Sequence, residues 1–164
     1  MGQMIKVGMA DLKICKAPDA VTTLGLGSCV GIAIRDPQTK IGGLAHIMLP
    51  DSTQMRAQAV NIPKFADTGA KELVNQLVKA GAGRTRLVAK IAGGAQMFAF
   101  QGTGNNDMMA VGERNAKAVR QVLAELKIPI LAEDCGLNYG RTVEFFPETG
   151  DYVIKAVGKP VKTI

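Results

Sequence analysis

Two apolar runs on either side of one turn signal place the strongest constraint on how this chain can fold. The first run covers residues 29–35, the second begins near residue 40, and Asp36-Pro37 stands at the break between them. This pattern predicts an antiparallel β-hairpin. A two-residue loop at 37–38 and a four-residue loop at 36–39 give the same register, in which paired positions sum to 75.

The two faces of the predicted hairpin differ in the size of their side chains. One is a core face, made of Val30, Ile32, Ile34, Ile41, Gly43, Ala45 and Ile47. The other is mostly small, made of Cys29, Gly31, Ala33, Gly42, Leu44 and His46. Small residues leave room either for a substrate or for a closely packed helix.

In this register Cys29 stands directly opposite His46, the only histidine of the chain. Opposed side chains of an antiparallel pair have Cβ atoms about 4.5–5.5 Å apart, which brings a thiol to an imidazole. The imidazole can take the thiol proton and later return it to a leaving amine. A loop of odd length would instead send the two side chains to opposite faces.

The residues before Cys29 complete a candidate catalytic group. The Gly-rich turn at 25–28 can point the amide groups of Gly27 and Ser28 at a developing oxyanion. Thr23, six residues before Cys29, can hydrogen-bond the far ring nitrogen of His46 and fix its tautomer. The alternative interpretation stays open, because a lone buried cysteine is usually a small apolar core residue. A lone histidine is likewise more often structural.

Composition narrows the class of protein. The chain has 164 residues, which fits one domain over 1–164 and allows a sizeable core. It has no apolar run of about 18 residues and no signal-peptide core, so we expect a cytoplasmic protein without membrane insertion. Three cysteines with no Cys-x-x-Cys spacing and one histidine predict neither a disulfide framework nor a metal site. No cofactor is expected.

The charge bears on partners. The net charge is +6, but Lys and Arg are scattered and Trp is absent, which argues against nucleic acid. A solvated basic surface explains the charge, and an acidic protein partner is the better functional alternative.

The remaining pattern predicts an α+β fold. Amphipathic helices are expected at about 64–80 and 113–127, and loops at 51–63 and 101–107. Strands are expected within 4–16 and at 20–24, 86–92, 128–132, 142–146 and 152–157, with a turn at 133–141. Pro129 makes 128–132 an edge strand or places a strand start there. The sum is a single-domain layered sandwich of mixed or antiparallel sheet packed with two main helices.

Several motifs resemble the CheD family, the chemoreceptor glutamine deamidases of bacterial and archaeal chemotaxis. They are TLGLGSC (23–29), GLAHIMLPD (43–51), KFADT (64–68), KIAGGAQMF (90–98), GERN (112–115), ED (133–134) and GR (140–141). They run in order along most of the chain. One departure is GLN at 136–138, where the family often has GGN.

The resemblance implies that Cys29, His46 and Thr23 are the family's catalytic cysteine, histidine and threonine. It implies hydrolysis of selected glutamine side chains on the cytoplasmic helices of chemoreceptors, without metal or cofactor, by a fold similar to deamidating toxins. It also implies a CheC-type phosphatase as partner. Two alternatives remain: a non-catalytic adaptor that binds the phosphatase, and a cysteine amidase that acts on another substrate.

Overall fold

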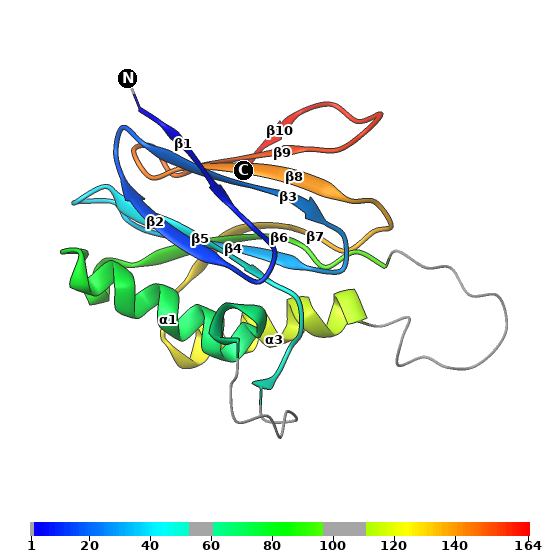
Figure 1. The fold of residues 1–164 in the computed structure, drawn as a ribbon, viewed down its shortest axis with the longest axis horizontal. Coiled ribbons are helices and arrows are strands. Elements are labelled where there is room, and N and C mark those ends of the chain that lie inside the picture. The colour runs from blue at the N-terminus through cyan, green and yellow to red at the C-terminus, as the bar shows by residue number, and fades with distance from the viewer. Residues whose placement is uncertain (1, 53–60, 97–110) are drawn as a thin grey trace, which may run out of the picture.

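The computed structural model describes residues 2–52, 61–96 and 111–164, and in these ranges it is an α+β sandwich of two sheets and a helix layer (Figure 1). The first sheet has the order β1 (Met4–Val7), β3 (Ala20–Leu26), β8 (Arg141–Phe146), β9 (Asp151–Lys155), β10 (Lys162–Thr163). The second has the order β2 (Leu12–Lys16), β5 (Ile41–Ile47), β4 (Val30–Asp36), β6 (Val88–Gly93), β7 (Ile130–Cys135). Both sheets are mixed, because β1–β3 and β6–β7 are parallel pairs.

The helices α1 (Ala66–Lys79) and α3 (Val111–Glu125) cover the outer face of the second sheet (Figure 1). The predicted helices at 64–80 and 113–127 are confirmed to within two residues at each end. Short 3₁₀ turns lie at Ile62–Lys64 and Arg84–Arg86. Within the described ranges no helix is both long and apolar enough to cross a membrane.

The layered α+β prediction is confirmed, with local differences in strand bounds. The predicted segment 4–16 is two strands, β1 and β2, that belong to different sheets. The predicted turn at 133–141 is wrong for 133–135, because β7 continues in parallel with β6 as far as Cys135. Pro129 does precede the edge strand β7, as predicted. The predicted loop 101–107 and residues 53–60 lie outside the described residues. That 1–164 forms one domain stays a prediction.

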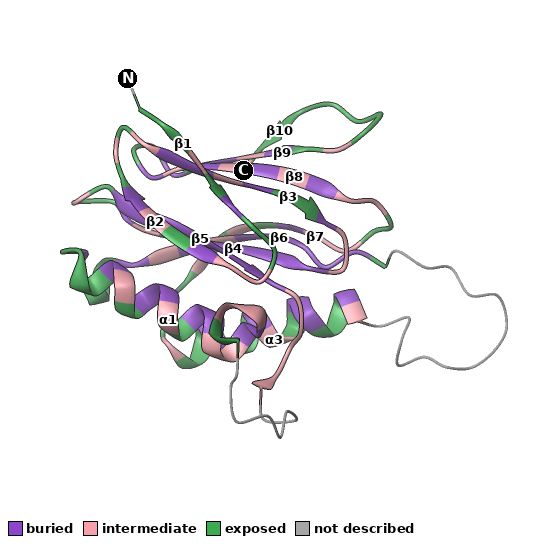
Figure 2. Cartoon of the chain, in the orientation of Figure 1, coloured by how far each residue is buried: buried purple, intermediate pink, exposed green. Residues whose placement is uncertain are grey.

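Two clusters of buried apolar side chains fill the spaces between the layers, and the strands and helices that contribute them carry the purple of buried residues in Figure 2. The larger lies between the second sheet and the helices and holds the predicted core face of the hairpin, including Ile32, Ile34 and Ile47. The smaller lies between the two sheets and holds the other hairpin face, including Cys29, Ala33 and Leu44. The alternation of the two faces is therefore as predicted.

The small hairpin face packs against the opposite sheet, so a closely packed helix, one of the two alternatives for that face, is not what covers it. Tyr152 of β9 is fully buried and donates a hydrogen bond from its hydroxyl to the Gly31 carbonyl, at 2.9 Å. A Cβ at Gly31 would lie only 2.5 Å from that hydroxyl oxygen. Small residues are therefore required here so that the two sheets can approach.

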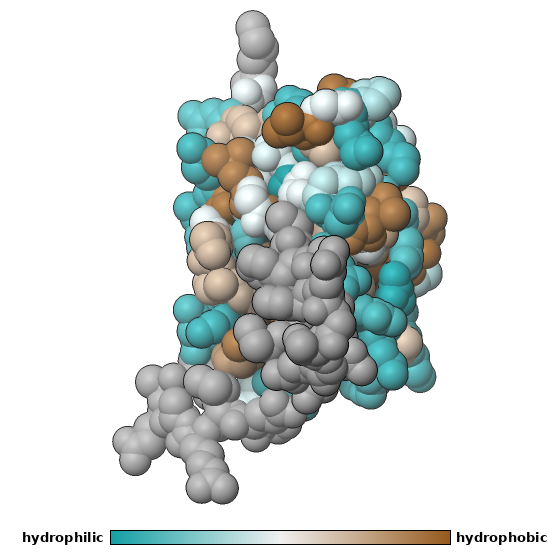
Figure 3. Space-filling model, turned by 90° about the vertical axis from the view of Figure 1, so that its right-hand side faces the viewer, coloured by the Kyte–Doolittle hydropathy of each residue, from teal (hydrophilic) through white to brown (hydrophobic). Residues whose placement is uncertain are grey.

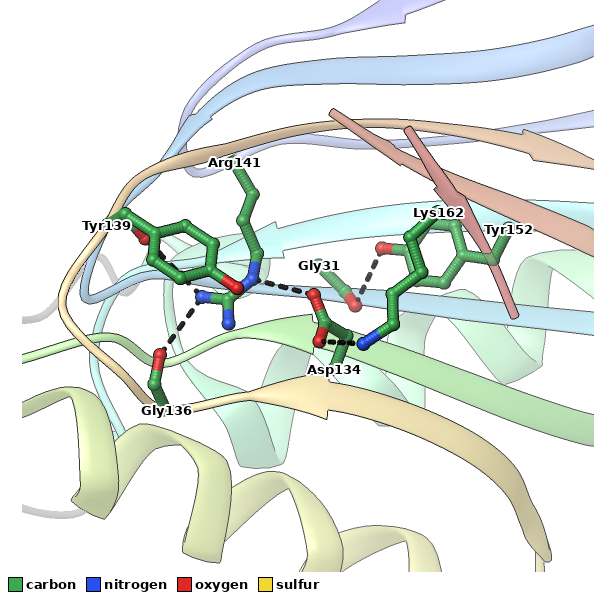
Figure 4. Close-up of polar contacts among 7 residues, drawn as sticks. All are labelled: Gly31, Asp134, Gly136, Tyr139, Arg141, Tyr152 and Lys162. Atoms are coloured by element: carbon green, nitrogen blue, oxygen red, sulfur yellow. Dashed lines mark hydrogen bonds and ion pairs between the residues drawn. The ribbon is translucent and has the colours of Figure 1, made fainter. Parts of the chain in front are cut away.

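A buried ion-pair cluster ties the two sheets together beside the β7–β8 turn (Figure 4). Arg141 of β8 is 2% exposed and donates from Nε to the Asp134 carboxylate of β7 at 2.9 Å. The Lys162 ammonium holds the other Asp134 oxygen at 3.0 Å. The Arg141 guanidinium also lies 4.5 Å from the centre of the Tyr139 ring. Asp134 thus joins β7 of one sheet to β8 and β10 of the other.

Candidate active site

The hairpin register differs by two positions from the predicted one. Paired positions of β4 and β5 sum to 77: Val30 faces Ile47 and Gly31 faces His46. The prediction that Cys29 directly faces His46 is therefore wrong. The loop still has an even number of residues, since Asp36 pairs with Ile41 and leaves four residues between them. Because the shift is even, Cys29 and His46 keep the same face.

Continuing the register by one step would set Cys29 opposite Met48, so His46 is its diagonal neighbour. Diagonal neighbours have Cα atoms roughly 7–8 Å apart, which is still within reach of longer side chains. Cys29 itself precedes the first residue of β4 and is 7% exposed. The thiol therefore lies at the open end of the hairpin, on the same side as the imidazole.

Thr23 of β3 contacts His46 across the space between the two sheets. Its Oγ1 lies 2.7 Å from His46 Nδ1 and donates its one proton to the carbonyl of Val7, also at 2.7 Å. Oγ1 must then accept from Nδ1–H. This bond fixes the tautomer in which Nε2 carries a lone pair. In the described part of the chain Nε2 has no hydrogen-bond partner.

A glycine pair at the end of β6, Gly93 and Gly94, holds the backbone of the cysteine loop, residues 27–29. Gly94 N–H donates to the Cys29 carbonyl at 2.8 Å, and Ala95 N–H donates to the Gly27 carbonyl at 2.9 Å. Gly93 has φ +111°, and a Cβ there would overlap the Cys29 carbonyl oxygen. Only glycine fits that position. Sequence reasoning did not assign residues 93–95 to the site, although a Gly-Gly pair that directly follows a predicted strand is a usable signal.

The oxyanion candidates differ in their backbone contacts. The Gly27 amide donates to the Gly25 carbonyl at 3.0 Å, so it is engaged in this structure. The Ser28 carbonyl accepts a side-chain hydrogen bond from Asn115 of α3, at 2.9 Å. Neither contact uses the Ser28 amide, which leaves Ser28 as the better donor of the two. Asn115 is a second residue at this loop that sequence reasoning did not assign to the site.

Burial keeps both reactive groups neutral. It raises the pKa of the Cys29 thiol above its ordinary value, although the Cys29 backbone amide acts in the opposite direction. Burial also lowers the pKa of His46, which is fully buried. At neutral pH the structure therefore holds a thiol and an uncharged imidazole, without an ion pair between them.

This neutral pair predicts the pH dependence of Cys29 alkylation. In the free protein the rate with iodoacetamide is expected to be still rising at about pH 9, above the ~8.5 of an ordinary thiol. The reason is that the thiolate fraction grows only as pH approaches the raised pKa. Peptide mass spectrometry of the Cys29 peptide measures the rate. A plateau reached below neutral pH would contradict the prediction, because it would indicate a thiolate–imidazolium pair.

The other cysteines lack these features. Burial, with the negative charge of Asp19, raises the pKa of Cys15 to about 11, and burial first, then Glu133, raises that of Cys135 to about 11. His46 is the only histidine, so neither has an imidazole of its own. Among the described residues no three His, Cys, Asp or Glu side chains gather where they could hold a metal ion.

The cysteine loop lies at the end of the sandwich that Figure 3 faces, where β3 ends and β4 begins (Figure 1). Where Figure 3 draws this surface in colour, apolar and polar residues are interspersed. Leu24, which directly follows Thr23, is 52% exposed, and Leu137 of the β7–β8 turn is 64% exposed. A pocket of about 230 Å³ beside the cysteine loop is lined by Gly94, Gln96 and Leu137, among others.

A thiol and a tautomer-fixed imidazole at the mouth of a two-sheet sandwich define a candidate cysteine hydrolase. Comparison with known proteins gives the family. Residues 48–156 match the family model described as CheD chemotactic sensory transduction. The chain therefore belongs to the CheD family, and the resemblance seen in the motifs is confirmed.

Relatives match over nearly the whole chain. A probable chemoreceptor glutamine deamidase CheD of Lachnoclostridium phytofermentans is 62% identical, with 100% of each chain covered. The chemoreceptor glutamine deamidase CheD of Halalkalibacterium halodurans is 51% identical, also with 100% of each covered. That of Bacillus licheniformis is 47% identical, with 98% of this chain and 95% of the relative covered.

Among solved structures, the chain is similar to a Bacillus licheniformis hypothetical protein YfiH. The TM-score is 0.48 at 14% identity, over 78% of this chain and 51% of that one. A similarity of this degree adds nothing to the functional argument.

Proposed function

We propose that this chain hydrolyses the side-chain amide of selected chemoreceptor glutamines, with Cys29 as nucleophile and His46 as general acid and base. The relatives that match the full chain are named chemoreceptor glutamine deamidases. The observation that carries the assignment of residues is the 2.7 Å hydrogen bond between Thr23 and His46 Nδ1. It leaves the Nε2 lone pair free to take the proton of a thiol on the same hairpin face.

The reaction balances with these residues and water. His46 Nε2 takes the Cys29 thiol proton as sulfur attacks the carboxamide carbon. The tetrahedral intermediate collapses, the C–N bond breaks, and the imidazolium gives its proton to the departing ammonia. Water, deprotonated by His46, then attacks the thioester, the C–S bond breaks, and the imidazolium returns its proton to the departing thiolate. The products are glutamate, ammonia and the restored thiol. Ser28 N–H is the proposed donor to the oxyanion.

The substrate surface is proposed to include the exposed apolar side chains around the cysteine loop. Leu24 and Leu137 are both more than half exposed, and they suit the apolar face of an amphipathic receptor helix. The net charge of +6 suits receptor helices that carry acidic residues. Because the substrate helices are cytoplasmic, the protein is proposed to act in the cytoplasm.

The direct test mixes the purified chain with cytoplasmic fragments of chemoreceptors. Each converted glutamine should gain ~1 Da in peptide mass, the NH-to-O exchange of an amide hydrolysed through a thioester. Released ammonia should match the number of converted sites. If receptor fragments from the same cell stay unmodified while a free amide is hydrolysed, the alternative of another cysteine amidase gains support.

Binding of a CheC-type phosphatase is a separate proposal. It is tested by mixing the two purified proteins and measuring association by calorimetry. The adaptor alternative would be favoured if the native chain deamidates no receptor fragment and a Cys29→Ala variant still binds the phosphatase. The buried Thr23–His46 hydrogen bond counts against an adaptor role as the sole function, because binding alone does not need a fixed tautomer.

Replacing Thr23 with valine is expected to lower kcat about 10- to 100-fold, the usual effect of losing a partner that orients a functional imidazole. Without this acceptor, His46 is free to take the wrong tautomer. Thr22→Val is the matched control, because Thr22 is the neighbour on the same strand and its hydroxyl bonds to the Val143 carbonyl instead. Equal activities of the two variants in the mass-shift assay would remove Thr23 from the mechanism.

A further inference from the structure

Asn115 lies in the first part of α3 and is fully buried. Its side-chain Nδ2 donates two hydrogen bonds, to the Ser28 carbonyl and to the Met48 carbonyl, each at 2.9 Å. The opposite orientation of the amide would set Oδ1 against two carbonyl oxygens. The hydrogen-bond network therefore fixes which atom is the donor.

The two carbonyls belong to the segments that carry the proposed nucleophile and base. Ser28 directly precedes Cys29, and Met48 is two residues after His46. The β4–β5 ladder ends at the pair Val30–Ile47, so both carbonyls lie just outside it. Beyond that point the ladder no longer sets the spacing of the two segments. The Asn115 amide spans this gap with one hydrogen bond to each side.

The helix that carries Asn115 is itself firmly placed. Val119 and Leu123, further along α3, are fully buried in the core against the second sheet. At its start, α3 packs so closely on residues 94–95 that a Cβ at Gly112 would overlap the Ala95 carbonyl. Gly94 in turn donates a hydrogen bond to the Cys29 carbonyl. The amide therefore acts from a rigid element on the loop.

The Asn115 Oδ1 atom is buried and has no partner among the described residues. A buried acceptor without a partner is unfavourable for stability. The Asn115 side chain therefore leaves its acceptor unused, whereas both of its donor hydrogen bonds to the two segments are made. This points to a role in placing the segments rather than in stabilising the fold.

We propose that Asn115 is a positioning residue that sets the distance between the Cys29 loop and the His46 strand by clamping the Ser28 and Met48 carbonyls. The inference rests on the proposed function, in which Cys29 and His46 act as a pair. Under this proposal, α3 helps to position the catalytic residues that the β4–β5 hairpin carries.

The first test compares kcat and KM of Asn115→Ala and Asn115→Asp with those of Val119→Ala. Val119 is the matched control, because it is buried on the same helix and bonds to neither segment. Melting temperatures show how far each variant is destabilised. A displaced nucleophile can cost about 10²-fold in kcat, so that loss is expected for both Asn115 variants with KM nearly unchanged. If kcat instead follows the melting temperature across all three variants, the inference is overturned.

The second test does not need a receptor substrate. The rate of Cys29 alkylation is measured at neutral pH in four proteins: native, His46→Ala, Asn115→Ala and the double variant. Removal of His46 is expected to slow alkylation about 10-fold or more in the native background, as loss of a general base does, and to have no effect in the Asn115→Ala background. Equal effects in both backgrounds, or none in either, overturn the inference. Failure of the native chain to deamidate any receptor fragment would contradict the proposed function and leave this cycle interpretable.

Discussion

Replacing Cys29 with alanine is expected to abolish glutamine hydrolysis, with a loss on the order of 10⁴-fold or more, as for removal of a covalent nucleophile. Without the sulfur no thioester can form, and the buried, neutral His46 would have to activate water directly against an amide. The mass-shift assay on receptor fragments measures the residual rate. Unchanged circular dichroism and melting temperature would show that the variant is folded.

Cys15→Ala and Cys135→Ala are the matched controls for this prediction. Both thiols have a pKa raised to about 11. The one histidine of the chain, His46, is the proposed base for Cys29. Their activities are expected to stay within about twofold of the native value, because a thiol that stays protonated at neutral pH is inert. Activity that survives in Cys29→Ala and is lost in either control would move the nucleophile away from Cys29.

Replacing Asp134 with alanine is expected to destabilise the fold by about 3–5 kcal/mol, the usual cost of removing one partner of a buried ion pair. The reason is that Arg141 is 2% exposed and would remain as a buried charge without its carboxylate (Figure 4). At roughly 2–4 °C per kcal/mol for a chain of this size, the melting temperature should fall by about 10 °C. Denaturant unfolding with a two-state fit measures the change in free energy.

Lys162→Met is the control for the Asp134 variant. The Lys162 side chain is 60% exposed, so its bond to Asp134 is screened by water and is expected to contribute less than about 1 kcal/mol. Removal of Lys162 leaves Arg141 still paired with Asp134. If the two substitutions cost the same, the buried Arg141 charge does not govern stability at this end of the sandwich.

The same cluster predicts a dependence of stability on pH. Burial by itself would raise the pKa of Asp134, but hydrogen bonds from Lys162 and Arg141 outweigh it and hold the pKa below its ordinary value. A lowered carboxyl pKa contributes stability above the unfolded value of about 3.9 and loses it as pH falls through the folded value. The difference in stability between the native chain and Asp134→Ala should therefore shrink below about pH 4. A difference that stays constant down to acid-induced unfolding would contradict this.

Local pattern was enough to predict much of the fold and part of the candidate site. The apolar spacing of residues 64–80 and 113–127 predicted both helices, because an amphipathic helix repeats every 3.6 residues wherever it packs. The alternation of side chains predicted the two hairpin faces, because successive residues of a strand point in opposite directions. That alternation put Cys29 and His46 on one face.

The register was wrong because the turn depends on contacts that are distant in sequence. The Asp36 carboxylate accepts hydrogen bonds from the Gly83 amide and from Arg86, which keep Asp36 at the end of β4. The chain then turns over four residues, and Lys40 takes a φ of +59° just before β5. Lysine rarely adopts this conformation, so nothing in the local sequence indicated it.

The sequence by itself determined that residues 29–47 form a hairpin with a thiol and an imidazole on the same face, because strand alternation is a local property of the backbone. Only the tertiary structure decided what surrounds that pair. Thr23 meets His46 because two different sheets stack, and Asn115 meets Ser28 and Met48 because a helix 67 and 87 residues away packs beneath them. Such contacts arise from the packing of whole layers, which no spacing along the chain encodes.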